Sequence, residues 1–320
     1  MVDEALRGSI RAVAKLITMV ENEMPGALEA LKKIYPKTGH AYTIGITGPS
    51  GSGKSTLTDR LTKELRQENY TIGIIAVDPS SPFTGGALLG DRLRMQEIAN
   101  DEDVFVRSMA TRGTLGGLSR STGDAIKILD AFGKDFILIE TVGVGQDEVD
   151  IVKTADTTVL VSVPGLGDDI QALKAGIMEI GDIFVVNKAD REGADRLATE
   201  LSLMLDMKRS QQDWSPPIVK TIATRGSGIS ELRERIFEHR KFLMDGEGLR
   251  QKRMDRIREE VTNLIEREIS GWVHKMMKTD GNFEDCLQQI QTRKKDPYSY
   301  AQELTEPILE YFRSCREDGT

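Results

Sequence analysis

The chain has 320 residues, 39% of them hydrophobic, so it can bury a substantial core as one large domain or as a domain with appendages. Its 51 acidic and 43 basic residues give a formal net charge of −8, which offers nucleic acid or an anionic membrane no general attraction. The two cysteines exclude a disulfide framework and indicate a reducing compartment. With no long apolar run at the N-terminus, we expect a soluble, cytoplasmic protein.

Two amphipathic helices are predicted in an N-terminal extension, residues 1–38. Apolar side chains recur at helical spacing before and after a break at Pro25: Leu6, Ile10, Val13, Ile17 and Val20, then Leu28, Leu31 and Ile34. We expect this extension to pack against the main domain.

Residues 39–244 alternate between short β-rich runs and helical stretches. The runs are centred on Ile44, Ile74, Val104, Ile137, Leu160, Val185 and Val219. Such alternation predicts an α/β fold with a mainly parallel sheet and helices on both faces. Ligands of such folds bind at the carboxyl ends of the strands.

Residues 245–320 contain no further β-rich run, which predicts an all-helical arm. Apolar side chains from Met254 to Met276 form one long stripe on a predicted helix. We expect such a stripe to be buried, either against the main domain or against the same stripe on a second copy of the chain.

A phosphate loop follows the first predicted strand. Residues 48–55, GPSGSGKS, have the two glycines separated by four residues and the following Lys and Ser of that motif. A helix with Leu57, Leu61 and Leu65 comes next, so N–H groups and a helix N-terminus would surround the phosphates. The predicted nucleotide contacts here are Gly48, Ser50, Gly51, Ser52, Gly53, Lys54, Ser55 and Thr56. Lys54 would reach the β- and γ-phosphates, and Ser55 would bind Mg²⁺.

The tetrapeptide Asn187–Asp190, NKAD, follows a predicted strand. The Asp190 carboxylate can accept hydrogen bonds from guanine N1–H and the 2-amino group, whereas adenine offers neither donor. Lys188 would lie along the base plane. This motif therefore predicts GTP and GDP as ligands, with Ala223 and Thr224 as a looser backbone contact to guanine O6.

Three acidic residues are candidate metal ligands and members of the catalytic set, together with Lys54. Glu140 and Asp78 each end an apolar run, and Asp91 lies in a glycine-punctuated loop after Asp78. The Gly143 N–H is expected to approach the γ-phosphate. Asp78 also fits a plain turn cap, and Ras-like GTPases carry Asp where Glu140 stands.

A further stretch after the strand Val159–Val163 carries Asp168, Gln171 and Lys174 but belongs to no nucleotide motif. We therefore expect these residues to couple the site to a partner. The alternative is a helix N-cap followed by a solvated lysine. Arg112 is either a charge-stabilising arginine or a surface ion-pair residue.

Together these motifs resemble the MeaB/ArgK family, the methylmalonyl-CoA mutase-associated GTPases of the SIMIBI class. The matching strings are GPSGSGKST, AVDPSSPFTGGALLGDRLRM, ATRGTLGG, ETVGVGQDEVD, VPGLGDDIQALKAG and NKAD. They occur in family order from Gly48 to Asp190, and the helical ends on both sides look similar.

The resemblance implies a GTPase that forms a homodimer through its C-terminal helices. It also implies a chaperone role for an adenosylcobalamin-dependent acyl-CoA mutase, in cofactor loading and protection. Because no residue of the sequence is an obvious general base for the attacking water, we expect slow hydrolysis that the partner accelerates. The resemblance places switches at 78–94, 140–146 and 164–176. Alternatives are a metal-delivering GTPase, a small-molecule kinase or transport-associated ATPase, and a scaffold with an inactive nucleotide site.

Overall fold

The computed structural model describes residues 1–78, 98–110, 120–141, 151, 153–165, 181–208, 214–279 and 283–306. The chain divides into two compact units, Met1–Arg256 and Ile257–Thr320. The division expected from sequence, at residues 38 and 244, stays a prediction.

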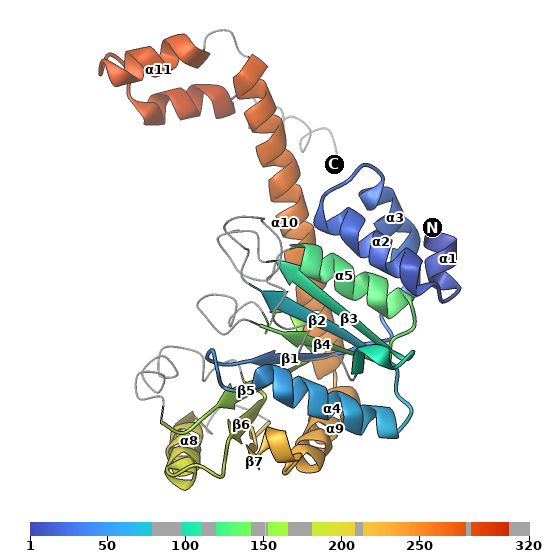
Figure 1. Ribbon diagram of the computed structural model, residues 1–320. Helices are drawn as coiled ribbons and strands as arrows, with labels where there is room; N and C mark the ends of the chain where they lie inside the picture. The colour runs from blue at the N-terminus through green and yellow to red at the C-terminus, as the bar shows by residue number, and fades with distance from the viewer. Residues whose placement is uncertain are drawn as a thin grey trace. The chain divides into compact units, whose positions relative to one another are not determined.

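The described residues of the first unit form a seven-stranded sheet in the order β3-β2-β4-β1-β5-β6-β7 (Figure 1). The strands are β1 (Tyr42–Thr47), β2 (Ile72–Asp78), β3 (Val104–Ala110), β4 (Phe136–Glu140), β5 (Thr157–Ser162), β6 (Ile183–Asn187) and β7 (Ile218–Thr221). Every pairing between them is parallel. The predicted α/β fold with its parallel sheet is thereby confirmed, and each strand includes its predicted centre.

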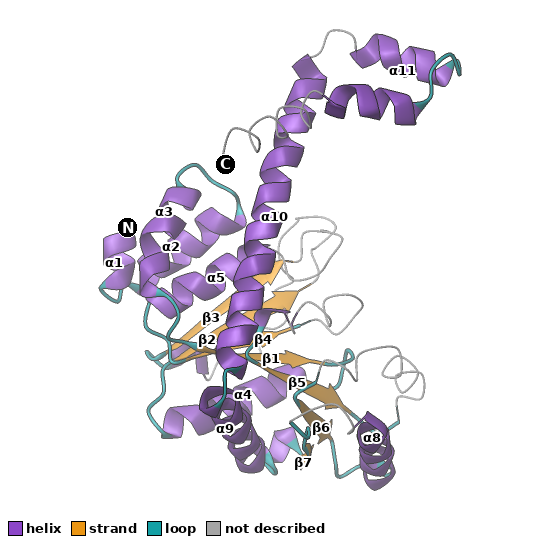
Figure 2. Ribbon diagram, turned by 180° about the vertical axis from the view of Figure 1, so that it is seen from behind, coloured by secondary structure: helices purple, strands orange, loops and turns teal. Residues whose placement is uncertain are grey.

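Successive strand residues point to opposite faces, and helices cover both (Figures 1 and 2). On one face, α4 (Lys54–Gln67) and α9 (Ile229–Asp245) pack against a core that includes Ile44, Leu138 and Val161. On the other, α2 (Ile10–Glu21) and α5 (Arg120–Ala131) bury Ile75 and Ile139, while α8 (Ala194–Lys208) covers Leu160 and Phe184.

The N-terminal extension packs on the α5 face, but its first predicted helix is broken in two. The structure has α1 (Val2–Leu6), α2 and α3 (Ala27–Ile34). Gly8 has a left-handed φ of 95°, and the Ser9 side chain accepts a hydrogen bond from the Ala12 N–H, so a new helix begins there. Leu6 and Ile10 are consequently exposed rather than part of the core.

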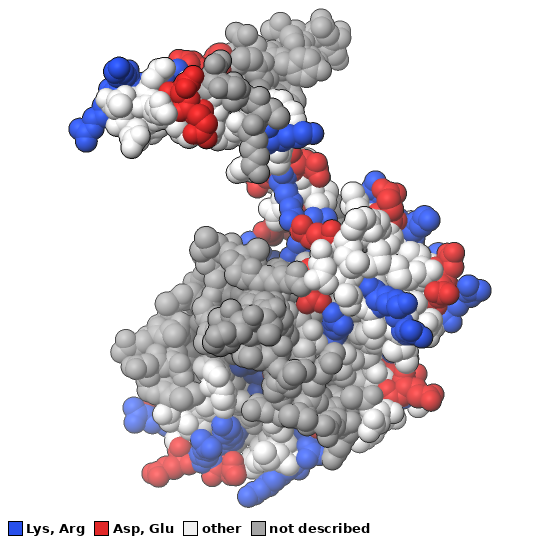
Figure 3. Space-filling model, turned by 45° about the horizontal axis from the view of Figure 1, so that its top comes forward, with Lys and Arg blue, Asp and Glu red and all other residues white. Residues whose placement is uncertain are grey.

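Short 3₁₀ turns and the C-terminal helices complete the described chain. The turns are η1 (Tyr35–Lys37), η2 (Ile98–Asn100) and η5 (Ala223–Arg225). The helices are α10 (Gly248–Thr279) and α11 (Phe283–Gln291), and residues 297–306 are also helical. None of the described helices is long and apolar enough to cross a membrane. In Figure 3, basic and acidic side chains are interspersed over the described surface.

The start of α10 is tied to the amino edge of the sheet through Asp156, which is fully buried just before β5. Its carboxylate accepts hydrogen bonds from Arg253 at 2.9 Å, Arg256 at 3.3 Å and the Thr43 N–H at 3.0 Å. Burial alone would raise the pKa of Asp156, but Arg256 and Arg253 outweigh it and hold that pKa below its usual value. The buried charge is therefore paired and fully hydrogen-bonded.

A second buried titratable group, His239 of α9, lies beside this cluster. Its Nδ1 is 2.8 Å from Thr157 Oγ1, its Nε2 is 3.4 Å from Asp182 Oδ1, and its ring contacts Trp214. Burial lowers the pKa of His239 to about 4, and the attraction of Asp182 offsets this only in part. The imidazole is thus neutral in the folded protein at neutral pH.

His239 should make folding stability depend on pH between 6.5 and 4. In the unfolded chain its pKa is near 6.5, so as pH falls through this window the unfolded state binds the proton first and stability is lost. A shift of this size corresponds to about 3 kcal/mol when the window is complete. Urea unfolding of wild type and His239→Asn across this range should give a shallower pH slope for the variant. Equal slopes would contradict the assignment.

Candidate active site

The polar motifs converge at the carboxyl edge of the sheet. The phosphate loop follows β1, which lies between β4 and β5, and these strands end at Glu140 and Ser162. The NKAD motif follows β6, two strands away from β1. Because all the strands are parallel, residues far apart in sequence meet at one edge, as expected for a ligand site.

Two loop glycines are required by close packing. A Cβ on Gly48, whose φ is 137°, would lie 2.1 Å from the Val161 carbonyl oxygen of β5. A Cβ on Gly53, whose φ is 92°, would lie 2.4 Å from the Asn187 side-chain nitrogen. Since both positions are left-handed and crowded, the loop backbone lies directly on β5 and on the NKAD motif.

The N-terminus of α4 is arranged to receive an anion. Gly53 is its N-cap and provides no side-chain hydrogen bond to the first turn, so the helix N-terminus is left to a ligand. Lys54 Nζ donates to the carbonyl oxygens of Gly48 at 2.8 Å and Pro49 at 3.0 Å, which holds the ammonium over the loop. Thr56 is half-buried in the first turn, and Ser50 lies at the exposed tip.

Glu140 and Ser55 are brought together as predicted for a metal site. Ser55 Oγ donates to Glu140 Oε1 at 2.5 Å, and Thr58 Oγ1 lies 3.2 Å from Oε2. Glu140 is 5% exposed. At the next position, the Thr141 hydroxyl donates to Thr47 Oγ1, which fixes the end of β4 against β1.

Asn187 connects the phosphate loop to the last strand. Its side-chain nitrogen donates to the Ser52 carbonyl oxygen at 2.8 Å, and its Oδ1 accepts from Thr221 Oγ1 and from the Ala223 N–H. Asn187 is 2% exposed, so these are buried hydrogen bonds. The Ala223 N–H is donated within the protein, so the predicted contact with guanine O6 would need another N–H of η5.

The other two polar residues of the motif remain open to solvent. Lys188 has a left-handed φ of 56°, and its Nζ donates to the Gly51 carbonyl oxygen at 2.7 Å. The Asp190 side chain is 40% exposed and lies 3.8 Å from Arg225. Thr224 of η5 accepts a hydrogen bond at its carbonyl from Arg60 of α4, which joins this turn to the phosphate-loop helix.

These residues fit a nucleotide and Mg²⁺. Ser52 Oγ is buried in the loop and has no hydrogen-bond partner among the described residues, so it is available to hydrogen-bond a ligand. The hydroxyl of Ser55 and the carboxylate of Glu140 are the hard oxygen donors that Mg²⁺ prefers.

Several predicted site residues lie outside the described residues. They are Asp91, Gly143, Asp168, Gln171 and Lys174, together with the side chain of Asp78 and with Arg112. Their roles stay predictions. Sequence reasoning missed Thr58 and Thr221, which support Glu140 and Asn187. The three-residue spacing of Ser55 and Thr58 on one helix face was the signal for the first.

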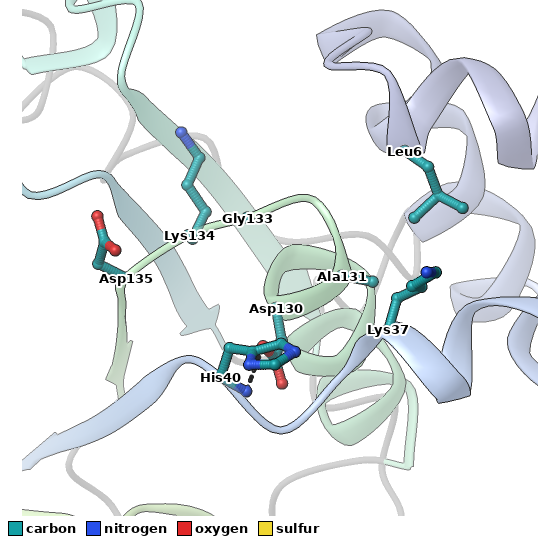
Figure 4. A pocket seen from close by; sticks show the side chains of 8 residues that line it. All are labelled: Leu6, Lys37, His40, Asp130, Ala131, Gly133, Lys134 and Asp135. Carbon is teal, nitrogen blue, oxygen red and sulfur yellow. Dashed lines mark hydrogen bonds between the residues drawn. The ribbon is translucent and has the colours of Figure 1, made fainter.

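A separate cavity of about 450 Å³ lies at the opposite, amino edge of the sheet (Figure 4). Its Asp130 carboxylate accepts from the N–H groups of Gly39, His40 and Ala41, and Lys134 donates to the Asp103 carbonyl oxygen. Asp130 joins α5 to the segment before β1, and Lys134 joins the turn between α5 and β4 to the segment before β3. The polar groups of this cavity therefore connect structural elements, and the cavity lies away from the phosphate loop and the NKAD motif.

The model of the family "Methylmalonyl Co-A mutase-associated GTPase MeaB" matches residues 13–278. The chain belongs to this family. It is a GTPase and binds GTP and GDP, and the phosphate loop and the NKAD motif both fall within the matched residues.

Similar proteins cover most of the chain. A putative GTPase of Pyrococcus horikoshii is 56% identical over 313 residues, which cover 97% of this chain and 98% of that protein. The mouse protein "Methylmalonic aciduria type A homolog, mitochondrial" is 38% identical over 234 residues, or 71% of this chain and 56% of that protein. A crystal structure of a LAO/AO transport system kinase has the same fold, with a TM-score of 0.72, 24% identity, and coverage of 96% and 97%.

Asp190→Asn should change the base preference. The substitution replaces an acceptor by a donor, which suits the 2-oxo group of xanthine in place of the guanine 2-amino group. GTP affinity should fall by about 1–3 kcal/mol, the cost of an unsatisfied polar group, and xanthosine triphosphate should bind better. Calorimetric titration with both nucleotides measures this. Asp195→Asn, an exposed change in α8, is the control, and unchanged GTP affinity in Asp190→Asn would contradict base recognition by Asp190.

Proposed function

We propose that this GTPase associates with an adenosylcobalamin-dependent acyl-CoA mutase of the methylmalonyl-CoA type and couples GTP hydrolysis to loading and protection of the mutase cofactor. The family match over residues 13–278, which includes every described nucleotide motif, is the observation that carries the proposal. The similarity to the mouse protein named for methylmalonic aciduria supports it. The cytoplasmic location stays a prediction.

In hydrolysis, the chain positions the phosphates and stabilises their charge. The α4 N-terminus and the loop N–H groups surround the β- and γ-phosphates, and Lys54 exchanges its two loop carbonyls for phosphate oxygens. Ser55 and Glu140 would hold Mg²⁺, together with Asp78 and Asp91. Bound Mg²⁺ neutralises negative charge on the phosphates.

The proposed coupling to the mutase involves Asp168, Gln171 and Lys174. They follow β5, the strand whose Val161 carbonyl lies against Gly48 of the phosphate loop. A partner that contacts this stretch would act on the segment that follows the strand packed against the phosphate loop. Partner contact rather than nucleotide contact is the proposed role of these three side chains.

Lys174→Ala should leave GTP hydrolysis by the isolated protein nearly unchanged but remove most of its acceleration by the mutase. The lysine is proposed to act only through the partner, so its loss has no effect when the partner is absent. GTP turnover is measured with and without purified mutase. Lys241→Ala, an exposed lysine on α9, is the matched control and should retain full acceleration. Equal acceleration in both variants would show that Lys174 is an ordinary solvated lysine with no role in coupling.

We also propose that the protein is a homodimer joined through the C-terminal helices. The apolar stripe of α10 is exposed in the single chain: Ile257, Val261, Leu264, Ile265, Ile269 and Trp272. Exposed apolar side chains repeated at helical spacing are typical of an interface. A second copy supplies the same stripe and so a self-complementary surface.

The double variant Ile265→Glu/Ile269→Glu should be monomeric, because it places four like charges on the two facing stripes. Light scattering of wild type and variant at micromolar concentration measures the mass. Glu268→Gln, an exposed change on the same helix, should remain dimeric. A wild type that is already monomeric would refute the proposed homodimer.

A further inference from the structure

We propose that Thr58 is a positioning residue for the metal-binding carboxylate of Glu140. Its hydroxyl holds the second oxygen of that carboxylate, and so determines how tightly the GTPase binds its divalent cation. The inference rests on the proposed use of Mg²⁺ by Ser55 and Glu140, and it assigns a role to a residue outside the phosphate-loop motif.

The alternation of β4 explains why Glu140 meets α4. Phe136 and Leu138 point into the core beneath α4, and Ile137 and Ile139 point to the opposite face. Glu140 is the next residue in the row of Phe136 and Leu138, so its side chain emerges on the α4 face. It pairs with Ile46 of β1 and with Ala76 of β2, which fixes its backbone in the centre of the sheet.

The helical spacing of α4 presents two hydroxyls to this carboxylate. Leu57 and Leu61 of α4 pack against the sheet, and Ser55 and Thr58 lie three residues apart, on one face of the helix. Ser55 Oγ lies 2.5 Å from Oε1 of Glu140, and Thr58 Oγ1 lies 3.2 Å from Oε2. Each carboxylate oxygen therefore has its own hydroxyl donor from one rigid helix.

The Thr58 hydroxyl has a second acceptor, the Lys54 carbonyl oxygen at 2.9 Å. A hydroxyl carries one proton, so the two acceptors share it, and the ionised carboxylate is the stronger one. Thr58 is fully buried. The hydroxyl can thus follow a movement of the carboxylate without being left unsatisfied.

The length of the Glu140 side chain gives this contact its importance. Glutamate has one more rotatable bond than aspartate, so holding its carboxylate in one place costs more conformational entropy. Ser55 contacts only one of the two carboxylate oxygens, Oε1. With Thr58 on the other oxygen, the carboxylate is oriented before the metal binds, and supports of this kind typically change metal affinity by about 10–100-fold.

The test measures divalent-cation affinity directly, apart from turnover. Mn²⁺, used as a paramagnetic probe in place of Mg²⁺, is titrated into the GDP-bound protein and followed by electron paramagnetic resonance. Thr58→Val keeps the side-chain shape but removes the hydroxyl, and it should bind Mn²⁺ about 10-fold more weakly. Thr58→Ser restores the hydroxyl and should bind close to wild type. On a Glu140→Gln background, Thr58→Val should cause little further loss.

Thr62→Val is the matched control. Thr62 is equally buried one turn further along α4, and its hydroxyl donates to the Thr58 carbonyl oxygen at 2.7 Å, away from Glu140. It should lose stability in urea unfolding as Thr58→Val does, but keep Mn²⁺ affinity. If Thr58→Val does not fold, Thr58→Ala replaces it.

The possible failures are distinguishable. Wild-type Mn²⁺ affinity in Thr58→Val, or an equal loss in Thr58→Val and Thr62→Val, would overturn the role of Thr58 while the proposed metal site stands. A wild-type protein whose GDP complex binds no Mn²⁺ would overturn the metal site and this inference together.

Discussion

The active site depends on side chains that donate hydrogen bonds to the carbonyl groups of the phosphate loop and so fix its backbone. Lys54 donates to the carbonyls of Gly48 and Pro49, Lys188 to that of Gly51, and Asn187 to that of Ser52. Three glycines of this loop, Gly48, Gly51 and Gly53, have left-handed φ angles, and in such a non-extended backbone successive N–H groups can converge on a phosphate. Recognition of guanine and of phosphate is thereby joined, because two of these donors belong to the NKAD motif.

Most of the fold follows from patterns visible in sequence. The seven β-rich runs, their alternation with helices and the long helix of α10 all appear in the structure. The break at Gly8 and Ser9 did not follow from periodicity, since the apolar spacing continues across it. A left-handed glycine followed by a capping serine ends one helix and begins another, and that local chemistry overrides the pattern.

Site residues whose role follows from their place in a motif could be predicted from the sequence. Contacts that depend on how separate strands pack together could not. The meeting of Ser55 and Glu140 follows from the order of the elements: Ser55 begins the helix that follows β1, and Glu140 ends the neighbouring strand β4. The burial of Asn187 against Gly53, and the use of the Ala223 N–H by Asn187, depend on how β6 and β7 approach the loop. No sequence motif gives the distance between these strands and the loop. The Ala223 N–H was therefore predicted to contact the base, although it donates to Asn187 within the protein.

Strand β5 links the two edges of the sheet. At the amino edge, buried Asp156 and Thr157 contact Arg253 of α10 and His239 of α9. At the carboxyl edge, the Val161 carbonyl of the same strand leaves no room for a side chain on Gly48. A strand of this length, hydrogen-bonded on both sides by β1 and β6, is a rigid element. The ion pairs of Asp156 therefore anchor the amino end of the same strand whose carboxyl end packs against the phosphate loop.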